Sequence, residues 1–172
     1  RQPDPELYIR WLQFGTFNSH MRVHGNMPRE PWQFGDQAVE VFRKFAKLRY
    51  QLLPYIESEA KYCCDTMRPM MCALPLAFED DPICAGIGDQ YMFGRSIMVA
   101  PILNPGGKRK VYLPKGTWFD YWTKEAIEGG VYIDVECPID RYPLFVRDGA
   151  LIPMIPECNR LPEGALPQLT VE

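Results

Sequence analysis

The sequence has 172 residues, which is enough for one hydrophobic core or for two small lobes. Its apolar share of 47% and aromatic share of 13% are typical of a globular protein and exclude a disordered chain. The net charge of −3 provides no basic face, so we expect no nucleic-acid partner. No run of about 18 apolar residues and no signal-peptide pattern is present, so we expect no membrane partner. Because the chain opens on Arg1 rather than Met, we expect either a processed start or a piece of a longer polypeptide.

The first third of the chain predicts a helix followed by a break. Residues 3–15 place Asp4 as the N-cap, Pro5 at the first helical position and Gly15 as the stop. Apolar residues at helical spacing predict one buried stripe, formed by Leu7, Tyr8, Trp11 and Leu12. Residues 21–32 then carry a cluster of glycine and prolines that ends regular structure.

A second, longer helix is expected from Asp36, which we assign as its cap. Its wide apolar face consists of Ala38, Val41, Phe42, Phe45, Leu48, Leu52 and Ile56. Pro54 lies inside this pattern and predicts a kink near residues 50–53, because its ring removes a backbone hydrogen bond. The apolar run over residues 68–78 then suits a strand that is covered on both faces, as in a parallel sheet.

From about Gly88 the pattern changes to short strands separated by turns. The strand-length pieces are SIMVAPIL, KRKVYLP, GTWFDYW, VYIDVE and PLFVRDGALIPM. Turns are predicted at residues 114–116 and 148–149, where proline presets φ and glycine accepts positive φ. This spacing indicates an antiparallel sandwich or barrel. A lone parallel strand in the first part would have no partner, which suggests the closing section of a larger α/β structure.

The six cysteines form no CxxC pair: Cys63, Cys64, Cys72, Cys84, Cys137 and Cys158. The adjacent Cys63 and Cys64 suit neither a zinc site nor a disulfide framework. We expect reduced cysteines, several of them in the core. This usage favours a reducing compartment such as the cytoplasm.

Three groups of residues offer chemistry, each with a plainer alternative. His20 and His24 have the four-residue spacing of zinc ligands, but Gly25 and Pro28 oppose a helix there, so we expect no metal site and no cofactor. The acids of residues 79–81 follow the apolar run, where a barrel places its active site, but three acids before a proline usually form a solvated turn. Aromatic side chains that could stack on sugars are more often core packing; they are Trp118, Phe119, Tyr121 and Trp122.

Taken together, several phrases in this order resemble the C-terminal part of glycoside hydrolase family 31, the α-glucosidase and α-xylosidase family. In the first half they are RWLQFGTFNSHMRVHG, PREPW, LRYQLLPYI and RPMM. In the second half they are DQYMFGRSIMVAPIL, VYLPKGTWFDYW and PLFVRDGALIPM. The resemblance covers nearly the whole chain and is weakest after about Pro156.

The resemblance implies the C-terminal section of a (β/α)8 barrel followed by an antiparallel β-sandwich domain. The fold class is thus α/β plus all-β, with residues 1–82 as the barrel portion and residues 83–172 as the sandwich. A whole barrel takes about 250 residues, so upstream parts of the same polypeptide would complete it. Family members use a retaining mechanism with two aspartates. Neither aspartate motif is present here, so we assign no catalytic residue to this chain.

The Arg-x-His phrase of the family corresponds here to Arg22 and His24. The resemblance implies that His24 contacts hydroxyls of the bound sugar and that Arg22 braces the loop, for instance against Glu30 or an upstream carboxylate. Gly25 after the histidine resembles bacterial α-xylosidases more than α-glucosidases, so we favour xylose over glucose. The expected partner is an oligosaccharide substrate, and the oligomeric state stays open.

Two alternatives belong to other functional classes. The chain alone could serve as a non-catalytic sugar-binding or structural module, and without both aspartates we expect it to be inactive by itself. A metal-dependent hydrolase using His20 and His24 would contain bound zinc.

Overall fold

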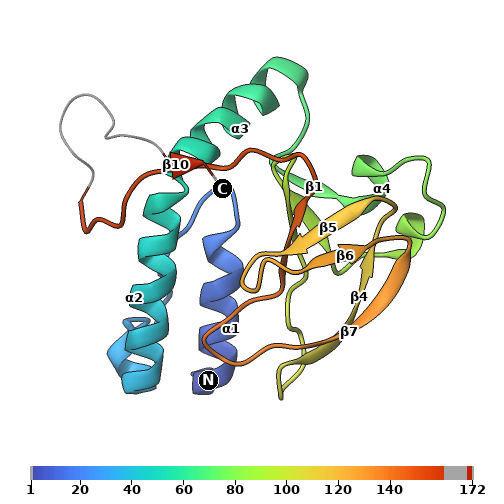
Figure 1. Cartoon of the computed structure of the whole chain (residues 1–172). Coiled ribbons are helices and arrows are strands. Elements are labelled where there is room, and N and C mark those ends of the chain that lie inside the picture. The colour runs from blue at the N-terminus through green and yellow to red at the C-terminus, as the bar shows by residue number, and fades with distance from the viewer. Residues whose placement is uncertain (1, 161–169, 172) are drawn as a thin grey trace.

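A computed structural model describes residues 2–160 and 170–171 of the chain (Figure 1). Three long helices lie on one side and the two main sheets on the other, while the short strand of residues 170–171 lies beside the helices. The larger sheet is six-stranded and lies between the helices and a smaller two-stranded sheet. Within the described residues, no helix is long and apolar enough to cross a membrane.

Helix α1 spans Pro5–Thr16 and begins as predicted. The Asp4 side chain accepts a hydrogen bond from the backbone N–H of Leu7 at 2.9 Å, which satisfies one of the free donors of the first turn. The predicted apolar stripe was wrong in part, since Leu7 and Trp11 are exposed. The helix instead turns its other side inward, and the buried residues are Tyr8, Ile9, Arg10, Leu12, Gln13 and Thr16.

Helices α2 (Asp36–Gln51) and α3 (Leu53–Thr66) meet at Leu52. The kink predicted near residues 50–53 is confirmed at Leu52, although the one helix expected is divided there into two. Pro54 lies in the first turn of α3, where no intrahelical N–H is needed. Asp36 was wrongly predicted as the cap of α2. Gly35 is the cap, with φ of 92°, and Asp36 lies in the first turn. Of the predicted apolar face, all members are buried except Phe42, which is half-buried.

The six-stranded sheet has the order β1-β2-β3-β8-β5-β6, and every neighbouring pair is antiparallel. Its strands are β1 (Met71–Ala73), β2 (Tyr91–Phe93), β3 (Ile97–Val99), β8 (Leu144–Arg147), β5 (Thr117–Asp120) and β6 (Ala126–Glu128). The antiparallel strands predicted in the second half are confirmed, while β2 and β6 were not predicted as separate strands. Residues 2–160 and 170–171 contain no closed barrel.

The strand predicted over residues 68–78 was wrong in length and in partner. Only Met71–Ala73 is extended, and it pairs antiparallel with β2 rather than lying in a parallel sheet. The short helix α4 (Leu74–Ala77) follows at once. Pro75 explains the change, because it has no N–H for a strand ladder but suits the first turn of a helix.

Alternation along β2, β3 and β8 divides the core between the two faces of the sheet. One set faces the helices and consists of Tyr91, Phe93, Ile97, Val99 and Leu144. The other set packs beneath the two-stranded sheet of β4 (Lys108–Leu113) and β7 (Val131–Glu136), and consists of Met92, Met98 and Phe145. Burial on both faces explains why these strands read as continuous apolar runs. The remaining elements are η1 (Pro31–Phe34), η2 (Cys84–Gly86), and the pair β9 (Pro153–Met154) and β10 (Thr170–Val171).

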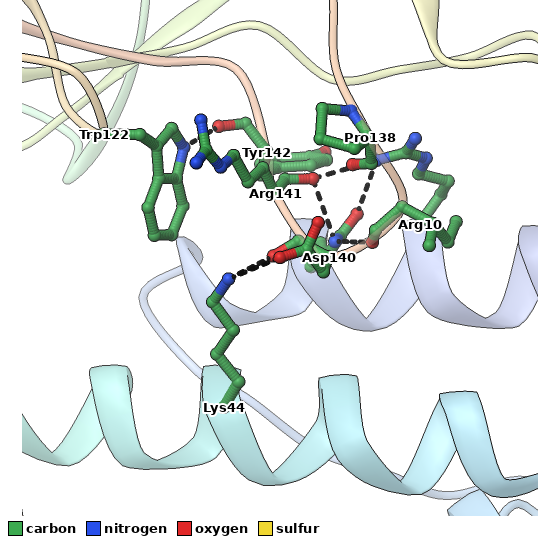
Figure 2. Close-up of polar contacts among 9 residues, drawn as sticks. Arg10, Lys44, Trp122, Pro138, Asp140, Arg141 and Tyr142 are labelled. Carbon is green, nitrogen blue, oxygen red and sulfur yellow. Dashed lines mark hydrogen bonds and ion pairs between the residues drawn. The ribbon is translucent and has the colours of Figure 1, made fainter.

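Polar side chains join the helices to the segment of residues 137–141 (Figure 2). The buried Arg10 guanidinium donates to backbone carbonyls of this segment at 2.8 and 2.9 Å, and the buried Gln13 amide donates to another at 2.7 Å. Lys44 of α2 lies 3.0 Å from the Asp140 carboxylate. Because unpaired buried groups are costly, these bonds fix the helices against the strands.

Candidate functional site

The segment between α1 and η1 carries both residues of the Arg-x-His phrase, and it is held at its start. Arg49 of α2 donates from Nη1 to the carbonyl of Thr16 at 2.6 Å and from Nη2 to that of Ser19 at 2.9 Å. The Tyr91 hydroxyl of β2 donates to the carbonyl of Phe17 at 3.1 Å. The chain therefore leaves α1 along a path set by two other elements.

The far end of the same segment is held by α1 itself. The Tyr8 hydroxyl donates to the carbonyl of Arg29 at 2.8 Å. Its ring stacks on Phe34 of η1 with centroids 3.8 Å apart and planes 7° apart. Burial raises the pKa of Tyr8, so its hydroxyl stays protonated and able to donate. Residues 20–28 thus span a gap between two fixed ends.

His24 and Arg22 are both exposed on this segment, and they border different hollows. His24 lines a hollow of about 910 Å³, and Arg22 lines a smaller one of about 170 Å³. Other side chains around the larger hollow include Trp32, Phe42, Arg43, Lys47 and Tyr50. In the described part of the chain, neither His24 nor Arg22 makes a side-chain hydrogen bond or ion pair, so both side chains are available to a ligand.

The role expected for Arg22 stays a prediction. Among residues 2–160, Arg22 makes no ion pair with Glu30, and its other expected partner was an upstream carboxylate outside this chain. Arg49 holds the segment instead. Sequence reasoning missed Arg49, because an arginine on the rim of an amphipathic helix has no pattern that separates it from a solvated surface residue.

His20 and His24 do not belong to a metal-binding group among the described residues. His20 Nδ1 lies 3.1 Å from the Ser19 hydroxyl. Within the described residues, no group of three or more His, Cys, Asp and Glu side chains could hold a metal ion.

The acidic run after α4 is built into a turn. Asp81 accepts from the backbone N–H of Ile83 at 3.1 Å and from the Tyr112 hydroxyl at 2.7 Å. Glu79 lies 3.8 Å from the Arg68 guanidinium. The structure therefore favours the plainer alternative of a turn at the surface, in which Asp81 also accepts a hydrogen bond from Tyr112 of β4.

The aromatic run in and after β5 packs inward. Trp118 is 1% exposed, and its indole N–H donates to the carbonyl of Pro114 at 2.7 Å. Tyr121 is buried as well. Trp122 donates to the carbonyl of Tyr142 at 2.6 Å (Figure 2). Trp118 and Tyr121 therefore belong to the core, and the half-buried Trp122 packs against it.

Two family models match consecutive parts of the chain. The model described as the glycosyl hydrolases family 31 TIM-barrel domain matches residues 1–59. The model described as the glycosyl hydrolase family 31 C-terminal domain matches residues 67–152. The chain belongs to glycoside hydrolase family 31. The resemblance read from the sequence is thereby confirmed.

Relatives within glycoside hydrolase family 31 include enzymes with different substrates. An α-xylosidase of Saccharolobus solfataricus is 42% identical over 153 residues, which cover 87% of this chain and 21% of that protein. An α-glucosidase of Bacillus thermoamyloliquefaciens is 36% identical over 151 residues, which cover 86% of this chain and 19% of that protein. The chain therefore spans about a fifth of the length of these curated relatives.

Solved structures of family 31 superpose closely on the chain. A dextranase of Flavobacterium johnsoniae, in complex with isomaltotriose, gives a TM-score of 0.89 at 35% identity and covers 97% of this chain and 21% of its own. An α-xylosidase of Xanthomonas citri gives a TM-score of 0.84 at 38% identity and covers 90% of this chain and 17% of its own. The arrangement of helices and sheets described above is thus that of the family's C-terminal barrel portion and following domain.

Proposed function

We propose that this chain is the C-terminal section of a retaining α-glycosidase that removes terminal α-linked xylose, or glucose, from oligosaccharides. The observation that carries the proposal is that family 31 domain models match nearly the whole chain, with glycosidases among its relatives. Both catalytic aspartates would come from upstream in the same polypeptide.

Within this section, His24 is the residue that contacts the substrate. Its imidazole is exposed on a segment fixed at both ends, and it has no partner among the described residues. A neutral imidazole donates from one nitrogen and accepts at the other, which suits a sugar hydroxyl that does both. Such a bond favours the transition state if it strengthens as the sugar ring flattens towards the oxocarbenium ion.

We further propose that residues 1–82 complete the barrel and that residues 83–172 form the following β-sandwich, of which residues 161–169 and 172 lie outside the described part. The pairing of β1 with β2 crosses this division, so the two parts share one sheet. The shared core and the bonds of Arg10 support a single rigid unit at the junction.

Xylose is preferred over glucose because the His24–Gly25 phrase resembles that of bacterial α-xylosidases. The 42% identity to an α-xylosidase supports this choice, while the 36% identity to an α-glucosidase keeps glucose as the second candidate. Residues that would block the sixth carbon of glucose lie mostly outside the chain.

The test is His24→Ala in the parent enzyme, assayed with aryl α-xyloside and aryl α-glucoside. Loss of one hydrogen bond to the sugar should lower kcat/KM about ten- to a hundredfold. His20→Ala is the matched control, because His20 lies in the same segment and its one side-chain hydrogen bond among the described residues is with Ser19. Equal activity of His24→Ala and the native enzyme would contradict the assignment. The 172-residue chain alone should show no turnover.

A further inference from the structure

Arg49 holds an unusual position for an arginine on a surface helix. Its guanidinium donates to three backbone carbonyls, at 2.6 Å to Thr16, at 2.5 Å to Asn18 and at 2.9 Å to Ser19. Within the described residues it makes no ion pair. Its acceptors are therefore the carbonyl of Thr16, the last residue of α1, and the carbonyls of Asn18 and Ser19 just beyond the helix.

The bonds of Arg49 act as a C-terminal cap supplied by another helix. The last carbonyls of a helix have no partner within it, and the helix dipole favours a cation at that end. Helix α1 has no basic residue in its own last turn, so Arg49 of α2 takes that place. Charge-assisted bonds of this kind are roughly twice as strong as neutral ones.

Arg49 is partly buried, so loss of these hydrogen bonds would leave polar groups with reduced access to water. Desolvation lowers the pKa of Arg49, although an arginine stays charged at any physiological pH. A shorter or uncharged side chain would leave three carbonyls without their donor and the segment without its fixed start. Among residues 2–160, no hydrogen bond or ion pair joins residues 20–24 to α2.

We propose that Arg49 is a positioning residue, which sets the place of the His24 imidazole at the bound sugar by fixing where the segment leaves α1. This inference rests on the proposed function of His24. Arg49 touches no substrate; its effect on the reaction passes through His24, because a displacement of about 1 Å in a contacting group costs up to about a hundredfold in rate.

The experiment is a double-mutant cycle in the parent enzyme with Arg49→Met and His24→Ala. Arg49→Met should lower kcat/KM about tenfold, mostly through kcat, because the His24 bond is worth most in the transition state. In the His24→Ala background, Arg49→Met should change kcat/KM by less than about twofold. Lys44→Met is the matched control, since Lys44 is also a cation of α2 that donates to a backbone carbonyl, that of Asp140. It should leave kcat/KM unchanged.

The outcomes separate this inference from the function on which it rests. If His24→Ala leaves activity unchanged, the proposed function of His24 is wrong and the inference falls with it. If His24→Ala lowers activity and Arg49→Met lowers it equally in both backgrounds, or in neither, only the positioning role is overturned. Melting curves confirm that each variant is folded at the assay temperature. If Arg49→Met does not fold, Arg49→Lys replaces it in the same cycle, with about a threefold loss expected in the native background alone.

Discussion

Glu59 of α3 and Arg95 of the turn between β2 and β3 form a two-pronged ion pair. Arg95 Nη2 lies 2.9 Å from Glu59 Oε1, and the Arg95 backbone N–H donates to Oε2 at 2.9 Å. The Glu59 side chain is only 5% exposed, whereas that of Arg95 is 57% exposed. Hydrogen bonding to this carboxylate raises the pKa of Arg95. The pair ties the end of the helical layer to the central sheet.

Arg95→Met should lower the free energy of unfolding by about 2–3 kcal/mol, because it leaves a buried carboxylate without its cation. The loss is below that of a fully buried pair, since water reaches the guanidinium. Lys61→Met is the matched control: it breaks the exposed Lys61–Asp65 pair of the same helix and should cost about 0.5 kcal/mol or less. Urea unfolding of both variants measures the difference, and equal losses would contradict the expected role of burial.

Gly94, in the same turn, should tolerate no side chain. Its φ is 64°, and a Cβ there would lie 2.5 Å from the Tyr55 hydroxyl and 2.6 Å from Glu59 Cγ. Gly149 has a similar φ of 74° with nothing within 4 Å of a Cβ. Gly149→Ala should therefore cost only the left-handed backbone term, about 1–2 kcal/mol. Gly94→Ala should cost about 3 kcal/mol or more. If both variants had the same thermal melting midpoint, the expected clash of a side chain at Gly94 with Tyr55 and Glu59 would be refuted.

Exposed cysteines should be alkylated faster than buried ones. Burial raises the pKa of Cys84 and of Cys137 to about 11, so both stay protonated at pH 8, and only the thiolate reacts. Cys64 is exposed. Iodoacetamide at pH 8 should label Cys64 first and reach Cys84 and Cys137 only after unfolding in urea. Mass spectrometry of peptides reads the order, and early labelling of Cys137 would show that its segment opens in the native state.

The Lys44–Asp140 contact should contribute stability that depends on pH. The hydrogen bond from Lys44 lowers the pKa of Asp140 below its ordinary value of 3.8. A lowered carboxyl pKa gives stability that is present above that ordinary value and is lost as the pH falls through the folded-state pKa. Because both side chains are partly exposed, Lys44→Met should cost at most about 1 kcal/mol at pH 7. The difference in free energy of unfolding between the variant and the native chain should narrow as the pH falls below 3.8. A gap of constant size would rule out this linkage.

Local signals predicted much of the helical part. Asp4 and Pro5 begin α1 because capping depends on residues within one turn of each other, and Pro54 breaks α2 from α3 for a similarly local reason. Which side of α1 lies inward was not predictable in the same way. Leu7 and Trp11 continue an apolar pattern, yet the polar Gln13 is buried in their place, because the amide finds carbonyls of residues 137–141.

In the candidate site, too, one residue was predictable from the sequence and another was not. His24 was found through the resemblance of its phrase to a family, and no composition or spacing argument reached it. Arg49 was not found, since its three acceptors lie 30 to 33 residues away along the chain and share no periodic pattern with it.

The sequence by itself determined the start of α1, the kink at Pro54, most of the antiparallel strands of the second half and the family. Each of these depends on neighbours within a few residues or on ordered phrases. Only the tertiary structure decided that β1 pairs with β2 and that Arg49 of α2 donates to the last carbonyl of α1. It also decided that Asp81 accepts a hydrogen bond from the Tyr112 hydroxyl. Those contacts join distant segments, and a buried donor or acceptor takes whichever distant partner the packed layers bring within reach.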